Sequence, residues 1–558
     1  MDSKDNIEEP EDKDSHMEGQ GEAESILPKI MCGYCRKYHT SECIAESIDS
    51  LRGGKYFQNE DSEPVDPKCF ELDFRKLKPG DLIELFTENC LKQYTLKHFV
   101  KGGSSLGLYK WENGRYVDCE EEIKAYVEEL GLKCGLKGKV KTHIVNEVIE
   151  KLKRRTYFKL QEEEEPKRIA FKNVVLDWEY FLNERVKGLD KCIIPIEETK
   201  DKPVFHLIPW DLDVELLRKC IQNYDPNEGG IRKAAEDLAP EVVKIFRDWV
   251  GDNWILLFEI IGFCLYPDYP FHKAFMLVGE GSNGKSTYLQ LIKTILGGEN
   301  TVGISLQDIC LYRFAASELY HKLANLFPDL PSEPLRYTGW FKILTGEDYA
   351  SAPRKFKSPI TFKNYAKLIF SANQLPEVTD MSYAFWRRWI IVEFPNKFEE
   401  NPDFFKNNFT EEAIRKIVAL SIIAFTNVWL NGGFTVEGEA ADFKETWLRR
   451  VNSIYAYVKS GMEEGRIKLD KNEYTETEEL YSDYRSWCEG EDRTPEEKAT
   501  FTKELERLFG IRKTRIRELG KRIYVYQGIK LLRSYEEGPE TEEEQMKLRE
   551  LDKYFETP

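Results

Sequence analysis

Residues 274–296, AFMLVGEGSNGKSTYLQLIKTIL, hold the most informative pattern in this chain of 558 residues. The run 274–278 is apolar and predicts a buried parallel strand. The segment 279–286, GEGSNGKS, fits G-x-x-x-x-G-K-[ST], the phosphate-binding loop or P-loop. Leucine and isoleucine follow at helical spacing, so strand, loop and helix stand in the order that a phosphate cradle needs. A chance match is the alternative, and the flanking elements disfavour it.

The P-loop predicts a site for ATP and Mg²⁺. Lys285 is expected to reach the β- and γ-phosphates, and the hydroxyl of Ser286 is expected to hold the metal ion. The residues expected to bind the nucleotide are Gly279, Gly281, Asn283, Gly284, Lys285, Ser286 and Thr287.

Length and composition predict several globular domains inside a cell. The chain is too long for one core, and its 41% hydrophobic and 32% charged residues are typical of globular proteins. The net charge of −18 argues against a uniformly basic coat for nucleic acid but leaves room for local basic patches. The acidic N-terminus does not resemble a signal peptide, and the longest apolar run, 254–266, is too short to span a bilayer. We therefore expect a cytoplasmic protein with no membrane partner and a buried core helix at 254–266.

Four metal-ligand side chains follow the acidic N-terminal tail. Cys32, Cys35, His39 and Cys43 are spaced C-x2-C-x3-H-x3-C. Four ligands of these types within a short segment suit a tetrahedral Zn²⁺ site. A redox pair or a coincidence in a flexible segment is the alternative. The sequence predicts a zinc site here.

Residues 66–165 have the pattern of a small mixed domain. The segment 106–119, LGLYKWENGRYVDC, alternates aromatic and polar residues around Asn113-Gly114 and predicts a β-hairpin. Helical patterns follow at 120–130 and 142–155.

Polar residues follow apolar runs beyond the P-loop. Asp329 ends one such run and is a candidate acid for holding Mg²⁺, unless the run is the end of a helix. Asn373 ends another run, where a group that senses the γ-phosphate or positions water must lie. Arg387 and Arg388 precede a further apolar strand. They are either structural ion-pair partners or, if ATP lies between subunits, an arginine finger.

Two basic regions are candidates for DNA contact. The first is a predicted hairpin whose tip carries Arg354, Lys355 and Lys357, with a solvated charged loop as the alternative. The second follows helical patterns at 477–488 and 500–509, where two β-prone runs turn at Gly520 and predict a winged helix. Its expected phosphate contacts are Arg515, Arg517, Lys521 and Arg522. A wing that contacts only protein is the alternative. Between the ATPase and this region, helices at 411–430 and 439–459 are expected to form a lid.

The order of these motifs resembles that of superfamily 3 helicases, in the branch of poxvirus primase-helicases and the helicase half of phage and plasmid primases. The similarity extends from about residue 68 to residue 532. Its motifs are GEGSNGKST (279–287), ELYHKLANLFPDL (318–330), KILTGED (342–348), KLIFSANQLP (367–376) and AFWRRWIIVEF (384–394). The resemblance implies a hexameric AAA+-type ring that hydrolyses ATP between subunits and pulls single-stranded DNA with a central hairpin.

The resemblance also assigns roles to individual residues. It places Lys285 and Ser286 in Walker A, Asp329 in Walker B and Asn373 as a sensor. Lys355 and Lys357 fall where the pore hairpin of the family lies, and Arg388 is preferred to Arg387 as the finger because it directly precedes the strand.

One departure from the family pattern concerns the residue that activates water. Pro328 precedes Asp329 where a second acid is expected, and Glu333 is a candidate for the missing role.

The sequence thus predicts an α/β fold with an AAA+-type P-loop ATPase core, an N-terminal mixed α/β helicase-associated domain and a C-terminal winged helix. The predicted function is that of an ATP-dependent replicative helicase of a virus or plasmid, acting on single-stranded and forked DNA with a separate primase or polymerase as a candidate partner. Priming by this chain is not expected, because its first 66 residues leave no room for a primase module. The alternatives are an ATP-switched origin-binding initiator and a packaging NTPase. The predicted segments are an acidic tail (1–30), a zinc-binding segment (31–66), the helicase-associated region (67–270), the ATPase core (271–400), a helical lid or linker (401–470), the winged helix (471–532) and a second acidic tail (533–558).

Overall fold

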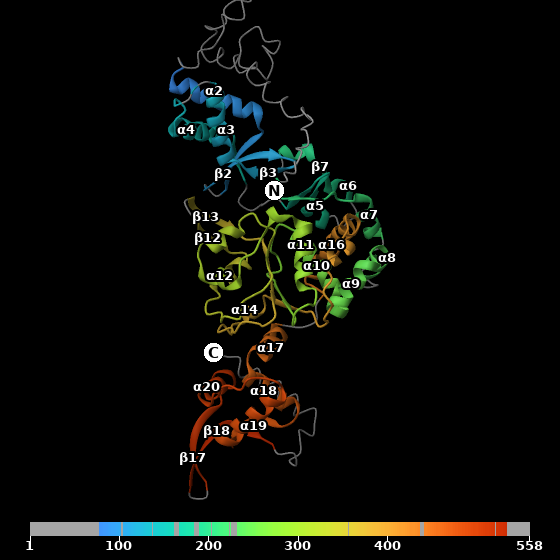
Figure 1. Ribbon diagram of the computed structural model, residues 1–558, viewed down its shortest axis with the longest axis vertical. Helices are drawn as coiled ribbons and strands as arrows, with labels where there is room; N and C mark the ends of the chain where they lie inside the picture. The colour runs from blue at the N-terminus through green and yellow to red at the C-terminus, as the bar shows by residue number, and fades with distance from the viewer. Residues whose placement is uncertain are drawn as a thin grey trace, which may run out of the picture. The chain divides into compact units, whose positions relative to one another are not determined.

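A computed structural model of the chain is shown in Figure 1. It describes residues 77–101, 104–134, 136, 138–160, 167–183, 189–201, 203–222, 224, 231–354, 357–435, 440–518 and 521–532. The predicted zinc ligands Cys32, Cys35, His39 and Cys43 lie outside the described residues.

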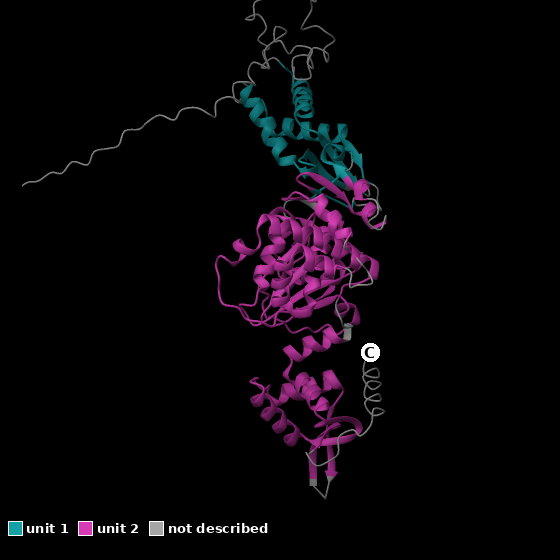
Figure 2. Ribbon diagram, turned by 90° about the vertical axis from the view of Figure 1, so that its right-hand side faces the viewer, with its two compact units in different colours: residues 1–170, 194–206 teal, residues 171–193, 207–558 magenta. Residues whose placement is uncertain are grey.

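The chain divides into two compact units (Figure 2). Unit 1 comprises Met1–Ala170 and Ile194–His206, and unit 2 comprises Phe171–Ile193 and Leu207–Pro558. This division is coarser than the segments predicted from sequence, whose boundaries stay predictions.

Unit 1 combines amphipathic helices with a small sheet. The sheet order is β3-β2-β1-β4, and its central hairpin turns at Asn113 and Gly114, both at positive φ, as the sequence predicts. The apolar faces of α2, α3 and α4 share one hydrophobic core. The elements are α2 (Pro79–Gln93), β1 (Leu96–Lys101), β2 (Ser104–Glu112), β3 (Arg115–Asp118), α3 (Glu120–Lys133), α4 (Thr142–Arg155) and β4 (Tyr157–Lys159).

Short elements occupy the stretch where the chain passes between units. They are β5 (Arg168–Phe171), β6 (Val174–Asp177), α5 (Trp178–Asn183), α6 (Leu189–Cys192), β7 (Ile193–Pro195), η4 (Ile196–Lys200) and β8 (Leu207–Ile208). Helices α7 (Val214–Gln222), α8 (Arg232–Leu238), α9 (Pro240–Val250) and η5 (Gly251–Asn253) then lead to the core of unit 2.

Two apolar helices, α10 (Trp254–Leu265) and α16 (Glu411–Asn431), pack against each other in that core. Every residue of α10 is buried, which confirms the predicted core helix. A side chain at Gly262 of α10 would overlap the backbone of Ser421 in α16, so glycine permits the close approach. Helix α16 is long and apolar enough to cross a membrane, but 72% of its most apolar window is buried within the protein, as in a core helix. The lid predicted over 411–430 and 439–459 stays a prediction.

The centre of unit 2 is a parallel sheet of order β10-β11-β14-β9-β15, which confirms the predicted α/β fold. Its strands are β9 (Ala274–Val278), β10 (Thr301–Val302), β11 (Ala324–Phe327), β14 (Lys367–Ala372) and β15 (Trp389–Glu393). Strands β9 and β14 are buried at every residue, because helices cover both faces of the sheet (Figure 1). The connecting helices are α11 (Lys285–Leu296), η6 (Gly298–Asn300), α12 (Leu306–Leu311), η7 (Ala315–Leu319), α13 (Gly339–Leu344) and α14 (Tyr383–Trp386), with α15 (Phe404–Asn408) after the last strand.

The predicted basic hairpin is present as β12 (Tyr349–Arg354) and β13 (Lys357–Lys363). The two strands are antiparallel, and Arg354 pairs with Lys357 in the final register position. Lys355 at the turn lies outside the described residues, as does the side chain of Lys357.

The C-terminal part of unit 2 contains the predicted helices and β-prone runs, with one strand that the sequence did not reveal. Its sheet has the order β16-β18-β17, all antiparallel, and β16 is the unpredicted strand. Tyr484, Phe501 and Tyr526 lie in its hydrophobic core. The elements are α17 (Ala440–Val451), α18 (Ser453–Glu463), β16 (Ile467–Glu476), α19 (Thr477–Gly490), α20 (Lys498–Phe509), β17 (Arg512–Glu518) and β18 (Lys521–Leu531).

The single helix predicted over 439–459 is wrong. The structure divides it at Asn452, whose backbone is extended and whose Oδ1 accepts a hydrogen bond from the amide of Tyr455 at 2.8 Å. Asparagine in this conformation starts a new helix, so α17 and α18 are separate elements.

Candidate functional site

The predicted nucleotide residues come together at one edge of the parallel sheet. The P-loop follows β9, Asp329 follows β11 by two residues, and Asn373 directly follows β14. Because these strands are parallel, their carboxyl ends meet at the same edge, where ligands of such sheets bind. The structure thus excludes the alternative that Asp329 ends a helix.

Lys285 is the centre of this cluster. Its ammonium donates hydrogen bonds to Gly279 O (2.7 Å), Asn283 Oδ1 (2.9 Å) and Asn373 Oδ1 (3.2 Å). Only 4% of the lysine is exposed. Burial lowers the pKa of Lys285, and the carboxylate of Asp329 opposes that shift. The lysine and the strand-end asparagine are thus held together although they lie far apart in the sequence.

The backbone of the P-loop explains its glycines. Gly281, Ser282 and Gly284 all have positive φ, and Gly284 is at +94°. A methyl group on Gly284 would lie 2.5 Å from the indole nitrogen of Trp249 in α9, so this position admits no side chain. Helix α11 begins at the next residue and points its first amide groups into the loop.

The groups predicted to hold Mg²⁺ are accessible. The hydroxyl-bearing Ser286 and the carboxylate-bearing Asp329 are both exposed, and Thr287 is partly exposed. Hard oxygen ligands of these kinds, few in number, suit Mg²⁺ bound together with phosphates. Among the described residues, no group of three or more His, Cys, Asp or Glu side chains is arranged to hold a metal ion by itself.

The loop after Asp329 is hydrogen-bonded to the loop after Asn373, because the amide of Leu335 donates to Glu377 O at 2.8 Å. The loop after Asp329 is also held by α12, where Gln307 Nε2 donates to Pro331 O (2.8 Å) and to Glu333 O (3.1 Å). Glu333, the candidate for activating water, is exposed on the first of these loops.

The arginine pair lies at the opposite edge of the sheet, at the start of β15. Arg388 is only 6% exposed, and its guanidinium donates to Ala384 O and to Lys342 O, the latter at 3.2 Å. Burial and the neighbouring Arg387 lower the pKa of Arg388. Arg387 is partly exposed. The sequence-based preference for Arg388 as a finger therefore disagrees with its burial, because its side chain is engaged within its own chain.

The basic residues of β17 and β18 form an exposed surface with one aromatic ring. Arg515 donates to the hydroxyl of Tyr524 and lies 4.9 Å from the centre of its ring, while Lys513 lies 5.2 Å from that centre. Tyr524 is 48% exposed. Arg517 stands opposite Arg522 in the strand register, a repulsive pairing that a bound anion would relieve. The side chain of Lys521 lies outside the described residues. Sequence reasoning missed Tyr524, although the alternation of its strand placed it on the same face as the cations.

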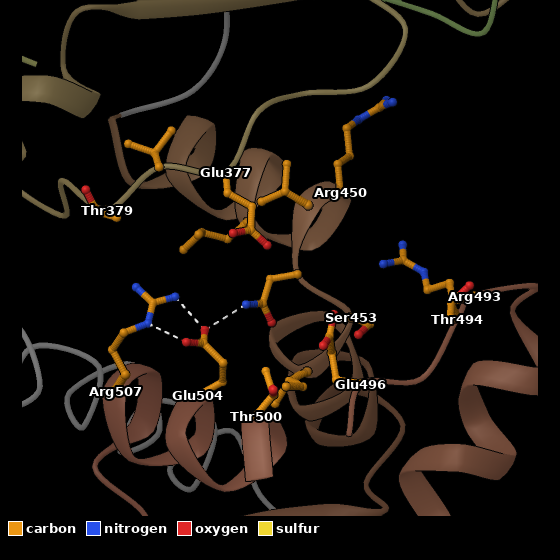
Figure 3. Close-up of a pocket in the computed structure, with 15 residues that line it drawn as sticks. Glu377, Thr379, Arg450, Ser453, Arg493, Thr494, Glu496, Thr500, Glu504 and Arg507 are labelled. Carbon is orange, nitrogen blue, oxygen red and sulfur yellow. Dashed lines mark hydrogen bonds and ion pairs between the residues drawn. The ribbon is translucent and has the colours of Figure 1, made fainter. Parts of the chain in front are cut away.

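A polar cleft of about 660 Å³ contains none of the predicted site residues (Figure 3). The cleft is lined by segment 377–379, by the junction of α17 and α18, and by α20. Glu504 accepts from Asn452 Nδ2 at 2.9 Å and pairs with Arg507 at 2.6 Å. Burial, together with Glu504 and Glu496, raises the pKa of Glu377. Glu504 and Arg507 are thus paired within the cleft, whereas Arg450 pairs with Glu393 outside it at 2.6 Å.

Comparisons with known proteins agree with part of this picture. The model of a family of unknown function (DUF5906) matches residues 277–388, from the P-loop strand to the arginine pair. A protein of Acanthamoeba polyphaga mimivirus described as "Putative helicase L207/L206" is 28% identical over 149 residues. That match covers 25% of this chain and spans only 15% of the length of the viral protein.

Solved structures of the apo C-terminal region of NrS-1 are also similar. Three of them give TM-scores of 0.39, 0.40 and 0.38 at 13%, 11% and 12% identity. Each match covers 79% of this chain and 98% of the other. Similarity at this level does not identify a shared function.

Proposed function

We propose that this chain is an ATP-dependent DNA helicase of viral or plasmid replication, of the superfamily 3 type. The observation that carries the proposal is the meeting of Lys285 with Asn373 at the edge of the sheet where Asp329 also lies. A P-loop lysine, an exposed acid and a strand-end amide are the groups that nucleoside triphosphate hydrolysis requires. The partial similarity to a viral protein described as a helicase supports strand separation as the use of that energy.

The residues at the edge of the sheet divide the chemistry among them. Lys285 neutralises charge on the β- and γ-phosphates, and Asn373 orients the γ-phosphate or the attacking water. Ser286 and Asp329 hold Mg²⁺, which when bound polarises the phosphate oxygens. The amide groups at the start of α11 would donate hydrogen bonds to the phosphates.

The arginine pair supports an assembly in which ATP lies between subunits. Arg387 stands at the amino end of β15, and the P-loop stands at the carboxyl end of the adjacent strand β9. An arginine on that edge contacts a γ-phosphate only when a neighbouring chain presents it. We therefore propose a ring of the AAA+ type, a hexamer by the family resemblance, with Arg387 rather than the buried Arg388 as the finger.

The basic surfaces are proposed to hold DNA. Hairpin β12–β13 carries Arg354 and Lys357 and is proposed to contact single-stranded DNA in the pore. The surface of β17 and β18 is proposed to be the wing of a winged helix and to contact the phosphates of forked DNA. A Zn²⁺ site at Cys32, Cys35, His39 and Cys43, a cytoplasmic location and a separate primase or polymerase partner remain part of the proposal.

Strand displacement on a forked DNA substrate tests the function. The purified chain should separate the strands with ATP and Mg²⁺ and should fail to do so when Lys285→Ala replaces the wild type. ATP-dependent duplex binding without strand separation would favour an origin-binding initiator, which the surface of β17 and β18 also suits. ATP hydrolysis that DNA does not stimulate would contradict both.

A further inference from the structure

The side chain of Asn283 lies beneath the P-loop rather than in the phosphate cradle. Only 3% of Asn283 is exposed. Its Oδ1 accepts from the ammonium of Lys285 at 2.9 Å, and its Nδ2 donates to Phe394 O at 3.2 Å. One buried amide thus connects the P-loop lysine with the residue that follows β15.

Gly279 provides the space that this amide occupies. A methyl group on Gly279 would overlap Asn283 Nδ2 and would lie 2.6 Å from Phe394 O. Gly279 is not at positive φ, so the absence of a side chain matters here because it leaves room for the side chain at position 283.

Segment 394–398, which we call the strap, runs along the P-loop. The amide of Phe394 donates to Val278 O at 2.8 Å, and that of Phe398 donates to Ser282 O at 2.7 Å. Lys397 forms an ion pair with Glu280 at 3.0 Å. Asn283 makes the buried connection between this strap and the lysine.

We propose that Asn283 is a positioning residue for Lys285: its amide holds the lysine ammonium on one side and the strap on the other. The inference rests on the proposed function, since it concerns the lysine of the same nucleotide site. It replaces the sequence-based expectation that Asn283 contacts the nucleotide directly. The backbone amides of the loop bind phosphate whether or not the lysine is held, so Asn283 acts mainly on the rate of hydrolysis.

Steady-state ATP hydrolysis separates positioning from binding. Asn283→Ala should lower kcat by about 10- to 100-fold, as loss of a supporting contact or a displacement of about 1 Å does elsewhere, with KM for ATP changed only a few-fold. Asn283→Asp keeps an acceptor for Lys285 but makes it an anion that competes with phosphate, so KM should rise instead. Asn408→Ala is the matched control, because Asn408 lies in α15, outside the strap and the P-loop, and donates to Phe404 O at 2.8 Å. It should leave both constants near wild type.

Labelling of lysines by an amine-reactive reagent, read by mass spectrometry without nucleotide, tests the contact independently of hydrolysis. Lys285 should react several-fold faster in Asn283→Ala, which removes an acceptor and opens the site, and more slowly in Asn283→Asp, which stabilises the ammonium. Exposed Lys406 of α15, outside the strap and the P-loop, serves as the internal reference. Thermal unfolding confirms that each variant is folded, and if Asn283→Ala is not, Asn283→Asp decides alone.

The two ideas fail in different ways. If the wild-type chain does not hydrolyse ATP, the proposed function is wrong. The labelling rates still test the contact between Asn283 and Lys285 in that case. Unchanged labelling of Lys285 in folded variants overturns the positioning role, as does a kcat for Asn283→Ala within about twofold of an active wild type.

Discussion

The P-loop and the surface of β17 and β18 use cations in opposite ways. Lys285 is buried and donates to three oxygens of its own chain. Arg517 and Arg522 stand opposite each other on an outer hairpin, beside a half-exposed tyrosine. A cation that must meet one phosphate in one geometry is held in advance, whereas cations that meet a polymer of phosphates need only be near it. The first region should respond to single-atom changes, and the second should respond to salt.

The largest effect is expected at Lys285. Lys285→Ala should reduce ATP hydrolysis by about 10³-fold or more, because the charge that develops on the phosphates loses its preorganised cation. Phosphate release measured on the purified variant checks this. Turnover near the wild-type rate would mean that the buried lysine is only structural. The contrast between the P-loop and the surface of β17 and β18 would then not hold.

The second-largest loss of ATP hydrolysis is expected at Arg387, and it should affect the nucleotide site of a neighbouring chain. Arg387→Ala alone should hydrolyse ATP about 10³-fold more slowly while still binding it. Mixed with Lys285→Ala under conditions of subunit exchange, it should recover part of the activity, because some interfaces then hold both intact groups. Absence of recovery in demonstrably mixed oligomers would place the arginine's role within its own chain. Arg388→Ala should instead mainly lower stability, since its buried hydrogen bonds are internal.

The core of unit 2 should respond to pH through Glu259. Burial raises the pKa of Glu259 to about 7, although Thr435 donates to both of its oxygens. The folded state therefore binds the proton more tightly than the unfolded state, and stability falls as pH rises from about 4.5 to about 7. Glu259→Gln should remove this dependence, which amounts to roughly 3 kcal/mol at most. Denaturant unfolding at pH 5 and pH 8 measures the free energy of unfolding at each pH. If that free energy changes equally with pH in the wild type and in Glu259→Gln, the assignment to Glu259 is wrong.

The smallest single effect is expected on β17 and β18. Arg515→Ala should weaken DNA binding by a few-fold and lower the log–log salt slope by about one, because one phosphate contact is lost. Tyr524→Phe keeps the ring and removes the hydroxyl that Arg515 contacts, so it separates stacking from positioning of the arginine. An unchanged salt slope in Arg515→Ala would mean that this surface binds protein rather than DNA.

Local patterns were sufficient for the elements that carry the site. An apolar run before a glycine-rich loop predicted β9 and α11, and the Asn113-Gly114 pair predicted a hairpin, because the backbone conformations that these residues favour are properties of a few neighbours. The helix over 439–459 was misjudged for the complementary reason. Its apolar periodicity continues across Asn452, while the side chain of Asn452 is also held by Glu504 of α20, which accepts from its Nδ2 at 2.9 Å and is distant in sequence.

The amino-acid sequence was enough to indicate a phosphate cradle, a parallel α/β fold and two basic hairpins, because hydrophobic periodicity and the preferences of turn-forming residues are local properties. Strand order was decided only by tertiary structure: β14 lies beside β9, which brings Asn373 to Lys285. So were the burial of Arg388 and the inward direction of Asn283, both set by residues distant in sequence that pack around them. Burial and strand order result from the competition of many long-range contacts for one core, and no short stretch of sequence contains that information.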